Sequence, residues 1–274
     1  MNKHMIFCHD DLDGLVGGVL LEESLRAQGA EIVDIVPSPP VVDGGDQCPV
    51  WDCSQAGWGI WFVDCSPNQS FGWFHPNGIY DHHPALPTSP AAAALVAAAF
   101  PPVDPTGGVD WLVRQVSMSD TRAGGTDEEI ADAVAFVQGV RFMFGPPTVD
   151  NVRQLLADAR RPHRDLDGNP AGGPGPDLLQ HVVIGRRAMA AEAEAARAEV
   201  ATGFDRIVAG RPVWAVNRPV TPVRDRTAEE AGHPTRLWYW RVETGEWQLS
   251  FRGDGARECA AAGARLPFLP DSLL

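Results

Sequence analysis

The sequence predicts an α/β protein: a parallel β-sheet with helices on both faces, joined by a long helix to a smaller C-terminal α/β domain. In the first half, short apolar runs alternate with helix-like segments, a pattern typical of parallel sheets. A Pro- and Gly-rich stretch then precedes a long Ala- and Glu-rich segment, and strand-like runs return near the C-terminus. We therefore expect a metal-binding catalytic domain over 1–160, a loop and linker helix over 161–203, and a substrate-binding domain over 204–274.

The elements of the first domain follow from its apolar runs and breakers. Thr126 followed by Glu129 predicts the capping box of one helix, and Pro37 predicts the end of the second strand. The expected strands are 5–8, 31–36, 59–63 and 78–80. The expected helices are 15–27, 90–100, 109–116 and 127–144.

The second domain is predicted to begin after one long helix. That helix covers 177–202 and ends at Gly203, while 161–177 reads as a loop. Gly245 predicts a turn between the last two strands. The expected strands are 207–208, 212–216, 236–242 and 246–251.

The charge balance argues against long nucleic acid as a partner. The chain has 22 Lys and Arg residues against 36 Asp and Glu residues, which gives a formal net charge of −14. Long DNA held through its phosphates needs a broad basic surface, so we expect a small substrate instead. Bound divalent cations would offset part of the negative charge at a site.

Cysteine usage and hydropathy predict a cytoplasmic protein. The five cysteines are odd in number and scattered, as in proteins that keep reduced thiols. No stretch approaches the roughly 20 apolar residues of a membrane helix, and the first residues do not resemble a signal peptide. We expect no membrane partner, and the oligomeric state is left open.

Three clusters of carboxylates and imidazoles each follow a short apolar run. Ligand sites of parallel sheets lie at the carboxyl ends of strands, so clusters so placed can converge. Each cluster alone could be a turn or a solvated loop, whereas their joint presence favours a hard-metal site. A fourth candidate, Asp120, falls at or just past a helix end. The clusters contain His9, Asp11 and Asp13, then Asp64, then Asp81, His82 and His83.

These residue types suit Mn²⁺, Mg²⁺ or Fe²⁺ better than a structural zinc ion. Two such ions about 3.5–4 Å apart could hold a phosphate and supply a hydroxide. We expect His9 and Asp11 to bind one ion, and Asp13, His82 and Asp120 the other. Asp64 is the expected bridge.

Two further side chains beside these ligands have expected roles. Asp81 is expected to orient a histidine. His83 is expected either to bind the phosphate or to protonate the leaving oxygen.

The chain contains a second copy of the pattern His-X-Asp-Leu-Asp-Gly, over 163–168. No strand precedes this copy, and a Pro- and Gly-rich stretch follows it. A loop so placed has little to hold ligands in fixed geometry, so we interpret it as a turn, with an exposed cation-binding loop as the lesser alternative.

The order and spacing of the first-half clusters resemble the motifs of DHH phosphoesterases, over roughly residues 1–125. This family includes RecJ-like exonucleases, nano-RNases, pAp phosphatases, cyclic-dinucleotide phosphodiesterases and family II pyrophosphatases. The resemblance implies two manganese ions, with Mg²⁺ or Co²⁺ as alternatives, and a substrate between two domains. The matching residues are His9, Asp11, Asp13, Gly14, Asp64, Asp81, His82, His83 and Asp120.

The C-terminal part is similar to the family's small (DHHA1-like) substrate-binding domain in fewer positions. Residues 250–252 match a Ser-X-Arg element and 261–263 match an Ala-Ala-Gly element. The Gly-Gly-Gly-His stretch usually found between them is absent, and Glu258 stands at the place of its histidine. The resemblance implies that Arg252 binds a substrate phosphate, with Arg257 as a second candidate. Each could instead be a solvated surface arginine.

Together these observations predict a metal-dependent hydrolase acting on phosphoric ester bonds. Short oligonucleotides or dinucleotides are the first expectation for the substrate, and 3′-phosphoadenosine phosphate is the second. Pyrophosphate and polyphosphate remain open. The altered C-terminal motif keeps one further alternative, a non-catalytic nucleotide-binding module of the same fold.

Overall fold

The computed structural model describes most of the chain. The described residues are 2–42, 49–67, 77–82, 90–165, 167–208, 210–219, 222–241, 247–254, 256–257 and 259. They form two compact units, Met1–Ala188 and Met189–Leu274, whose boundary falls inside the long helix α7 (Pro176–Val200). Each unit is described by itself below.

The first unit is built on a four-stranded parallel sheet with the order β2-β1-β4-β6. Its strands are β1 (Lys3–His9), β2 (Glu31–Ser38), β4 (Gly59–Val63) and β6 (Gly78–Tyr80). A short parallel pair, β3 (Val41–Val42) with β5 (Ser66–Pro67), lies apart from this sheet. The predicted parallel sheet is confirmed.

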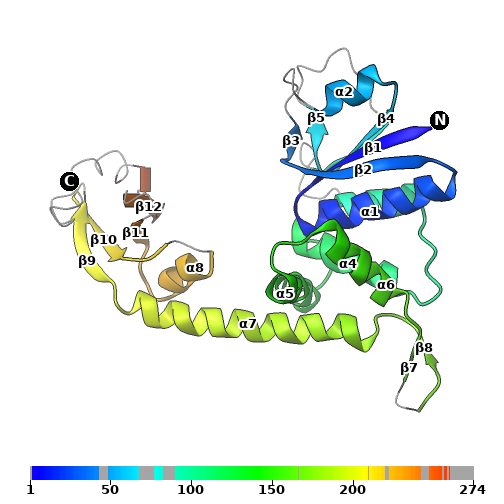
Figure 1. Cartoon of the computed structure of the whole chain (residues 1–274). Helices are drawn as coiled ribbons and strands as arrows, with labels where there is room; N and C mark the ends of the chain where they lie inside the picture. The colour runs from blue at the N-terminus through cyan, green and yellow to red at the C-terminus, as the bar shows by residue number, and fades with distance from the viewer. Residues whose placement is uncertain are drawn as a thin grey trace. The chain divides into compact units, whose positions relative to one another are not determined.

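Helices cover both faces of the sheet, as Figure 1 shows for α1 and α2. Successive side chains of β1 point to opposite faces, so Ile6 joins one core and Phe7 the other. The larger core contains α1 (Leu12–Ala27), α3 (Ala92–Ala99), α4 (Gly108–Thr121), α5 (Asp127–Phe144) and α6 (Val149–Ala159). The smaller core packs α2 (Pro49–Gln55) on the opposite face.

Several elements differ in extent from those predicted. The second strand does not end at Pro37 but continues to Ser38, because β2 is an edge strand and an edge strand tolerates the missing N–H of proline. Helix α1 begins earlier, at Leu12, and α4 runs on to Thr121. Helices α2 and α6 were not predicted. The predicted capping box of Thr126 and Glu129 is present at the start of α5.

The second unit contains a four-stranded mixed sheet with the order β12-β11-β10-β9. Its strands are β9 (Phe204–Val208), β10 (Arg211–Val216), β11 (Thr235–Arg241) and β12 (Trp247–Gly253). The helix α8 (Pro222–Glu230) was not predicted. It packs against the sheet through Ala228, which shares a core cluster with the fully buried Trp238 of β11. Gly245 lies outside the described residues.

The second His-X-Asp-Leu-Asp-Gly copy begins with β7 (His163–Arg164), which pairs with β8 (Pro170–Ala171) in a hairpin. A side-chain oxygen of Asp165 accepts hydrogen bonds from the backbone amides of Asp167 and Asn169. The carboxylate therefore closes the turn, as interpreted from the sequence.

Two further expectations can be compared with the structure. Among the helices it describes, none combines the length and the apolar character needed to cross a lipid bilayer. The cysteines in the described part of the chain carry free thiols, and Cys48 lies outside it.

Candidate metal centre

The first cluster sits where β1 passes into α1. Asp11 is the N-cap of α1 and accepts a hydrogen bond of 3.0 Å from the backbone amide of Gly14, which fixes the turn between His9 and Asp13. A Cβ atom at Gly14 would lie 2.6 Å from the carbonyl oxygen of His9. Only glycine permits this close approach of the helix to the strand end.

The second and third clusters follow the ends of β4 and β6. Asp64 directly follows β4, is fully buried and has a positive φ of 55°. Its backbone amide donates a hydrogen bond of 2.7 Å to the carbonyl oxygen of Tyr80, the last residue of β6. His82 follows two residues later. A non-glycine residue in the left-handed region is uncommon and concentrates at functional sites.

Asp64 presents one carboxylate oxygen to each of two histidines. Its Oδ2 lies 3.2 Å from Nδ1 of His9, and its Oδ1 lies 3.1 Å from Nε2 of His82. Nδ1 of His9 also lies 3.1 Å from Oδ2 of Asp11, and Nε2 of His82 also lies 2.9 Å from Oδ2 of Asp120. Asp64 therefore lies between two ligand groups.

Each group offers one imidazole and two carboxylates. Ligand atoms of His9, Asp11 and Asp64 lie within 4.8 Å of one another, and so do those of a second trio. That second trio consists of Asp13, His82 and Asp120. Nitrogen and carboxylate oxygen donors, without thiolates, suit Mn²⁺, Mg²⁺ or Fe²⁺. The donor sets therefore fit two divalent ions, and the structure brings together all six residues expected as ligands.

Asp13 is held by the beginning of α3. Its Oδ2 accepts a hydrogen bond of 2.7 Å from the backbone amide of Ala92, and the amide of Ala93 lies 3.3 Å from its Oδ1. These amides stabilise a negative charge at the start of α3. Asp120 comes from the last turn of α4, so four segments of the first unit build the site.

Without a cation the carboxylates repel one another. Burial raises the pKa of Asp13 to about 8, and the charges of Asp120 and Asp11 act in the same direction. Burial also raises the pKa of Asp64 to about 10, together with the charges of Asp13, Asp11, Asp120 and Asp81. A bound divalent ion would relieve this repulsion and favour the ionised carboxylates.

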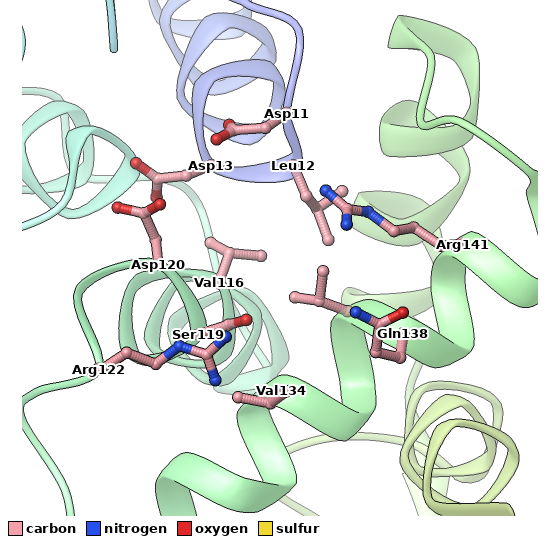
Figure 2. A pocket seen from close by; sticks show the side chains of 11 residues that line it. Asp11, Leu12, Asp13, Val116, Ser119, Asp120, Arg122, Val134, Gln138 and Arg141 are labelled. Carbon is pink, nitrogen blue, oxygen red and sulfur yellow. The ribbon is translucent and has the colours of Figure 1, made fainter. Parts of the chain in front are cut away.

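A pocket of about 230 Å³ opens beside these ligands (Figure 2). One side of the pocket is formed by Asp11, Asp13 and Asp120. Two arginines reach into it from other sides: Arg122, the residue that caps α4, and Arg141 of α5. Sequence reasoning missed both arginines. Arg122 could have been noticed because it lies two residues beyond Asp120, whereas only the packing of α5 on α4 brings Arg141 to this place.

The remaining candidate residues belong to neither ligand group. Asp81 is half-buried and contributes to the raised pKa of Asp64, while His83 lies outside the described residues. Arg252, on β12, and Arg257 belong to the second unit, and both side chains are exposed. The stretch 261–263 and Glu258 also lie outside the described residues.

No protein-family model matches the chain, and no curated protein is significantly similar to it in sequence. Among solved structures, it is similar to a DHH domain described as belonging to a family of ribosomal proteins, with 11% identity, a TM-score of 0.47, and coverage of 94% of this chain and 75% of that one.

Two other solved structures are similar at the same level. Manganese-bound RecJ from Thermus thermophilus shares 14% identity at a TM-score of 0.40, over 90% of this chain and 44% of that one. An exopolyphosphatase-related protein from Bacteroides fragilis shares 10% identity at a TM-score of 0.35, over 93% and 79%. All three likenesses are distant, so the function proposed below rests on the side chains of this chain.

Proposed function

We propose that this chain is a DHH-type, metal-dependent phosphoesterase that hydrolyses P–O bonds of small phosphorylated substrates. The observation that carries this proposal is the position of Asp64, whose two oxygens face the two histidines of separate ligand groups. A buried carboxylate so placed is suited to bridge two divalent ions. Such a pair is typical of enzymes that cleave phosphate esters.

The proposed metal ligands follow the two groups of side chains described above. His9 and Asp11 hold one ion, while Asp13, His82 and Asp120 hold the other. Asp64 is shared. Divalent ions at such a site polarise a phosphoryl oxygen and make water more acidic.

The protein's own groups position the ligands. The amides at the start of α3 hold Asp13, and the N-cap geometry of Asp11 holds the turn after His9. Asp81 keeps the role of orienting a histidine, and His83 that of binding the phosphate or giving a proton to the leaving oxygen.

Short oligonucleotides or dinucleotides are the proposed substrates. The net charge of −14 disfavours long nucleic acid. The pocket of about 230 Å³ beside the proposed ligands has room for only a small part of a substrate. Mn²⁺ is the first metal to test, because imidazole and carboxylate ligands both suit it.

A metal-dependence assay tests the proposed activity. We expect the protein, stripped with EDTA, to hydrolyse bis-p-nitrophenyl phosphate and a short RNA only after Mn²⁺, Mg²⁺ or Co²⁺ is restored. Asp120→Ala should lose at least about a hundredfold in rate, because a metal ligand is removed. Asp110→Ala is the matched control, since Asp110 is an exposed aspartate on the same helix, outside both ligand groups.

A panel of substrates then distinguishes the candidate substrate classes. Dinucleotides, cyclic dinucleotides, 3′-phosphoadenosine phosphate and pyrophosphate should be compared under the best metal condition. Highest kcat/KM on dinucleotides supports the proposed substrate class. Absence of turnover on the whole panel with every metal would contradict an enzymatic role.

A further inference from the structure

The pocket in Figure 2 joins the metal ligands to a positively charged wall. Its lining includes three of the proposed ligands, so the pocket is continuous with the metal centre. The guanidinium groups of Arg122 and Arg141 reach into the pocket from two other sides. Ser119 and Gln138 add neutral hydrogen-bonding groups to the lining.

These two arginines differ from most arginines of the first unit. Arg114, Arg153 and Arg160, among others, pair with carboxylates. In the part of the chain that the structure describes, Arg122 and Arg141 have no ion pair or side-chain hydrogen bond. Their charges are therefore available to a bound anion.

The backbone at Arg122 gives independent support. Arg122 caps the C-terminus of α4 in the left-handed conformation, with φ at 55°. Glycine is the residue that this position favours, because a Cβ atom makes the conformation costly. An arginine kept at a strained position next to a site points to a function for its side chain.

The nearby apolar residues and the small volume limit what the pocket can hold. Leu12, Val116, Val134 and Val137 line the rest of it, and 230 Å³ is below the roughly 300–1,000 Å³ of pockets that bury whole small molecules. A phosphate group with part of its sugar is of suitable size. A complete second nucleotide is not.

We infer that Arg122 and Arg141, with Ser119 and Gln138, form a subsite for a second phosphate group of the substrate. This inference rests on the proposed function and adds a substrate class to it: small compounds with a terminal phosphate close to the phosphate that is cleaved. A 5′-phosphorylated dinucleotide is such a compound. The subsite lies wholly within the first unit, unlike the candidates Arg252 and Arg257.

Steady-state kinetics with Mn²⁺ test the subsite. The wild-type protein should prefer a 5′-phosphorylated dinucleotide to the same dinucleotide without that phosphate by at least about tenfold in kcat/KM. Arg122→Gln and Arg141→Gln should each raise KM for the phosphorylated form by about tenfold and change KM for the unphosphorylated dinucleotide much less. Arg187→Gln is the matched control, because Arg187 is an exposed arginine of the same unit outside the pocket.

Arg122→Gly separates a binding role from a structural one. The substitution removes the side chain and the backbone strain together, so it should raise Tm while it weakens the preference for the terminal phosphate. If Arg122 had no role in binding, its replacement by glycine would raise Tm without weakening the preference for the terminal phosphate. Glutamine at the same position keeps the Cβ atom and the strain, so Arg122→Gln should leave Tm near that of the wild type.

Calorimetric titration of tripolyphosphate into the Mg²⁺-loaded protein tests the subsite by a direct binding measurement. About tenfold weaker binding in Arg122→Gln and Arg141→Gln, with wild-type binding in Arg187→Gln, supports it. If this pattern appears in a protein that hydrolyses no substrate, the proposed function fails and the subsite stands. Equal affinity for tripolyphosphate in the wild type and the three glutamine variants would overturn the subsite. An equal loss of kcat/KM on the dinucleotides with and without the 5′-phosphate would overturn it as well.

Discussion

The carboxylate of Asp13 accepts a hydrogen bond of 2.7 Å from the backbone amide of Ala92, the first residue of α3. This contact ties the turn after β1 to a helix that lies 79 residues further along the chain. It also places a buried negative charge beside Asp11 and Asp120, both of which raise the pKa of Asp13. The chain thus holds a carboxylate where, without a cation, its ionised form is unfavourable.

The substitution Asp13→Asn should have opposite effects on the stability of the metal-free and metal-loaded proteins. Without metal, removal of the carboxylate relieves repulsion and burial of charge, and the amide oxygen can still accept from Ala92, so Tm near pH 7.5 should rise. With Mn²⁺, a ligand is lost and the stabilisation by metal should shrink. Thermal melts of both proteins with EDTA and with Mn²⁺ measure this. A fall in Tm under both conditions would show that Asp13 has a purely structural role.

The free energy of unfolding of the metal-free protein should fall as pH rises. Asp13 has a pKa of about 8 and Asp64 of about 10 in the folded state, both above the unfolded value of 3.8. These two carboxylates therefore bind more protons in the folded state than in the unfolded state, and their contribution to stability decreases as pH rises above about 4. Burial lowers the pKa values of His4 and His181, which has the opposite effect near pH 6, so urea unfolding in EDTA from about pH 7 to pH 8.5 tests the carboxylates.

Mn²⁺ is the control for that pH series. Bound cations favour the ionised carboxylates, so the loss of stability between about pH 7 and pH 8.5 should be reduced or reversed. The same decline with and without metal would contradict the placement of these carboxylates at a metal centre.

Gly14→Ala should disrupt the metal centre. The new Cβ atom would lie 2.6 Å from the carbonyl oxygen of His9 and 2.8 Å from its backbone nitrogen, so α1 must move away from the end of β1. We expect weaker Mn²⁺ binding by at least about tenfold, measured by calorimetry. At Gly175 the nearest atom to a new Cβ is 3.7 Å away, an ordinary contact, so Gly175→Ala should bind as the wild type does. Wild-type affinity in Gly14→Ala would show that the turn is not part of the site.

The order of the clusters was sufficient to group the ligands, because the carboxyl ends of parallel strands meet at one edge of the sheet. Their anchoring was not predictable in the same way. The contact of Asp13 with Ala92 depends on how α3 packs on α1, and the place of Arg141 depends on α5. The sequence did contain a signal for α6, since Thr148 and Asn151 form a capping box at its start. The continuation of β2 through Pro37 depends on its edge position in the sheet.

Substitutions at Asp64 and His83 should separate metal binding from catalysis. Asp64→Ala removes the shared carboxylate and should abolish binding of the metal pair. His83→Ala should leave the metal bound and slow hydrolysis by about a hundredfold or more, the range expected for loss of a group that transfers a proton. Metal content and turnover, measured on the same preparations, distinguish the two. Equal loss of metal in both variants would show that His83 is a ligand.

The central claim is that side chains at the ends of β1, β4, β6 and α4 and at the start of α1 share two divalent ions. Anomalous diffraction at the manganese edge, from crystals grown with Mn²⁺, tests it most directly. We predict two peaks, one among His9, Asp11 and Asp64 and the other among Asp13, His82 and Asp120, with Asp64 between them. A crystal with Mn²⁺ bound elsewhere, and no peak among these six side chains, would contradict the account.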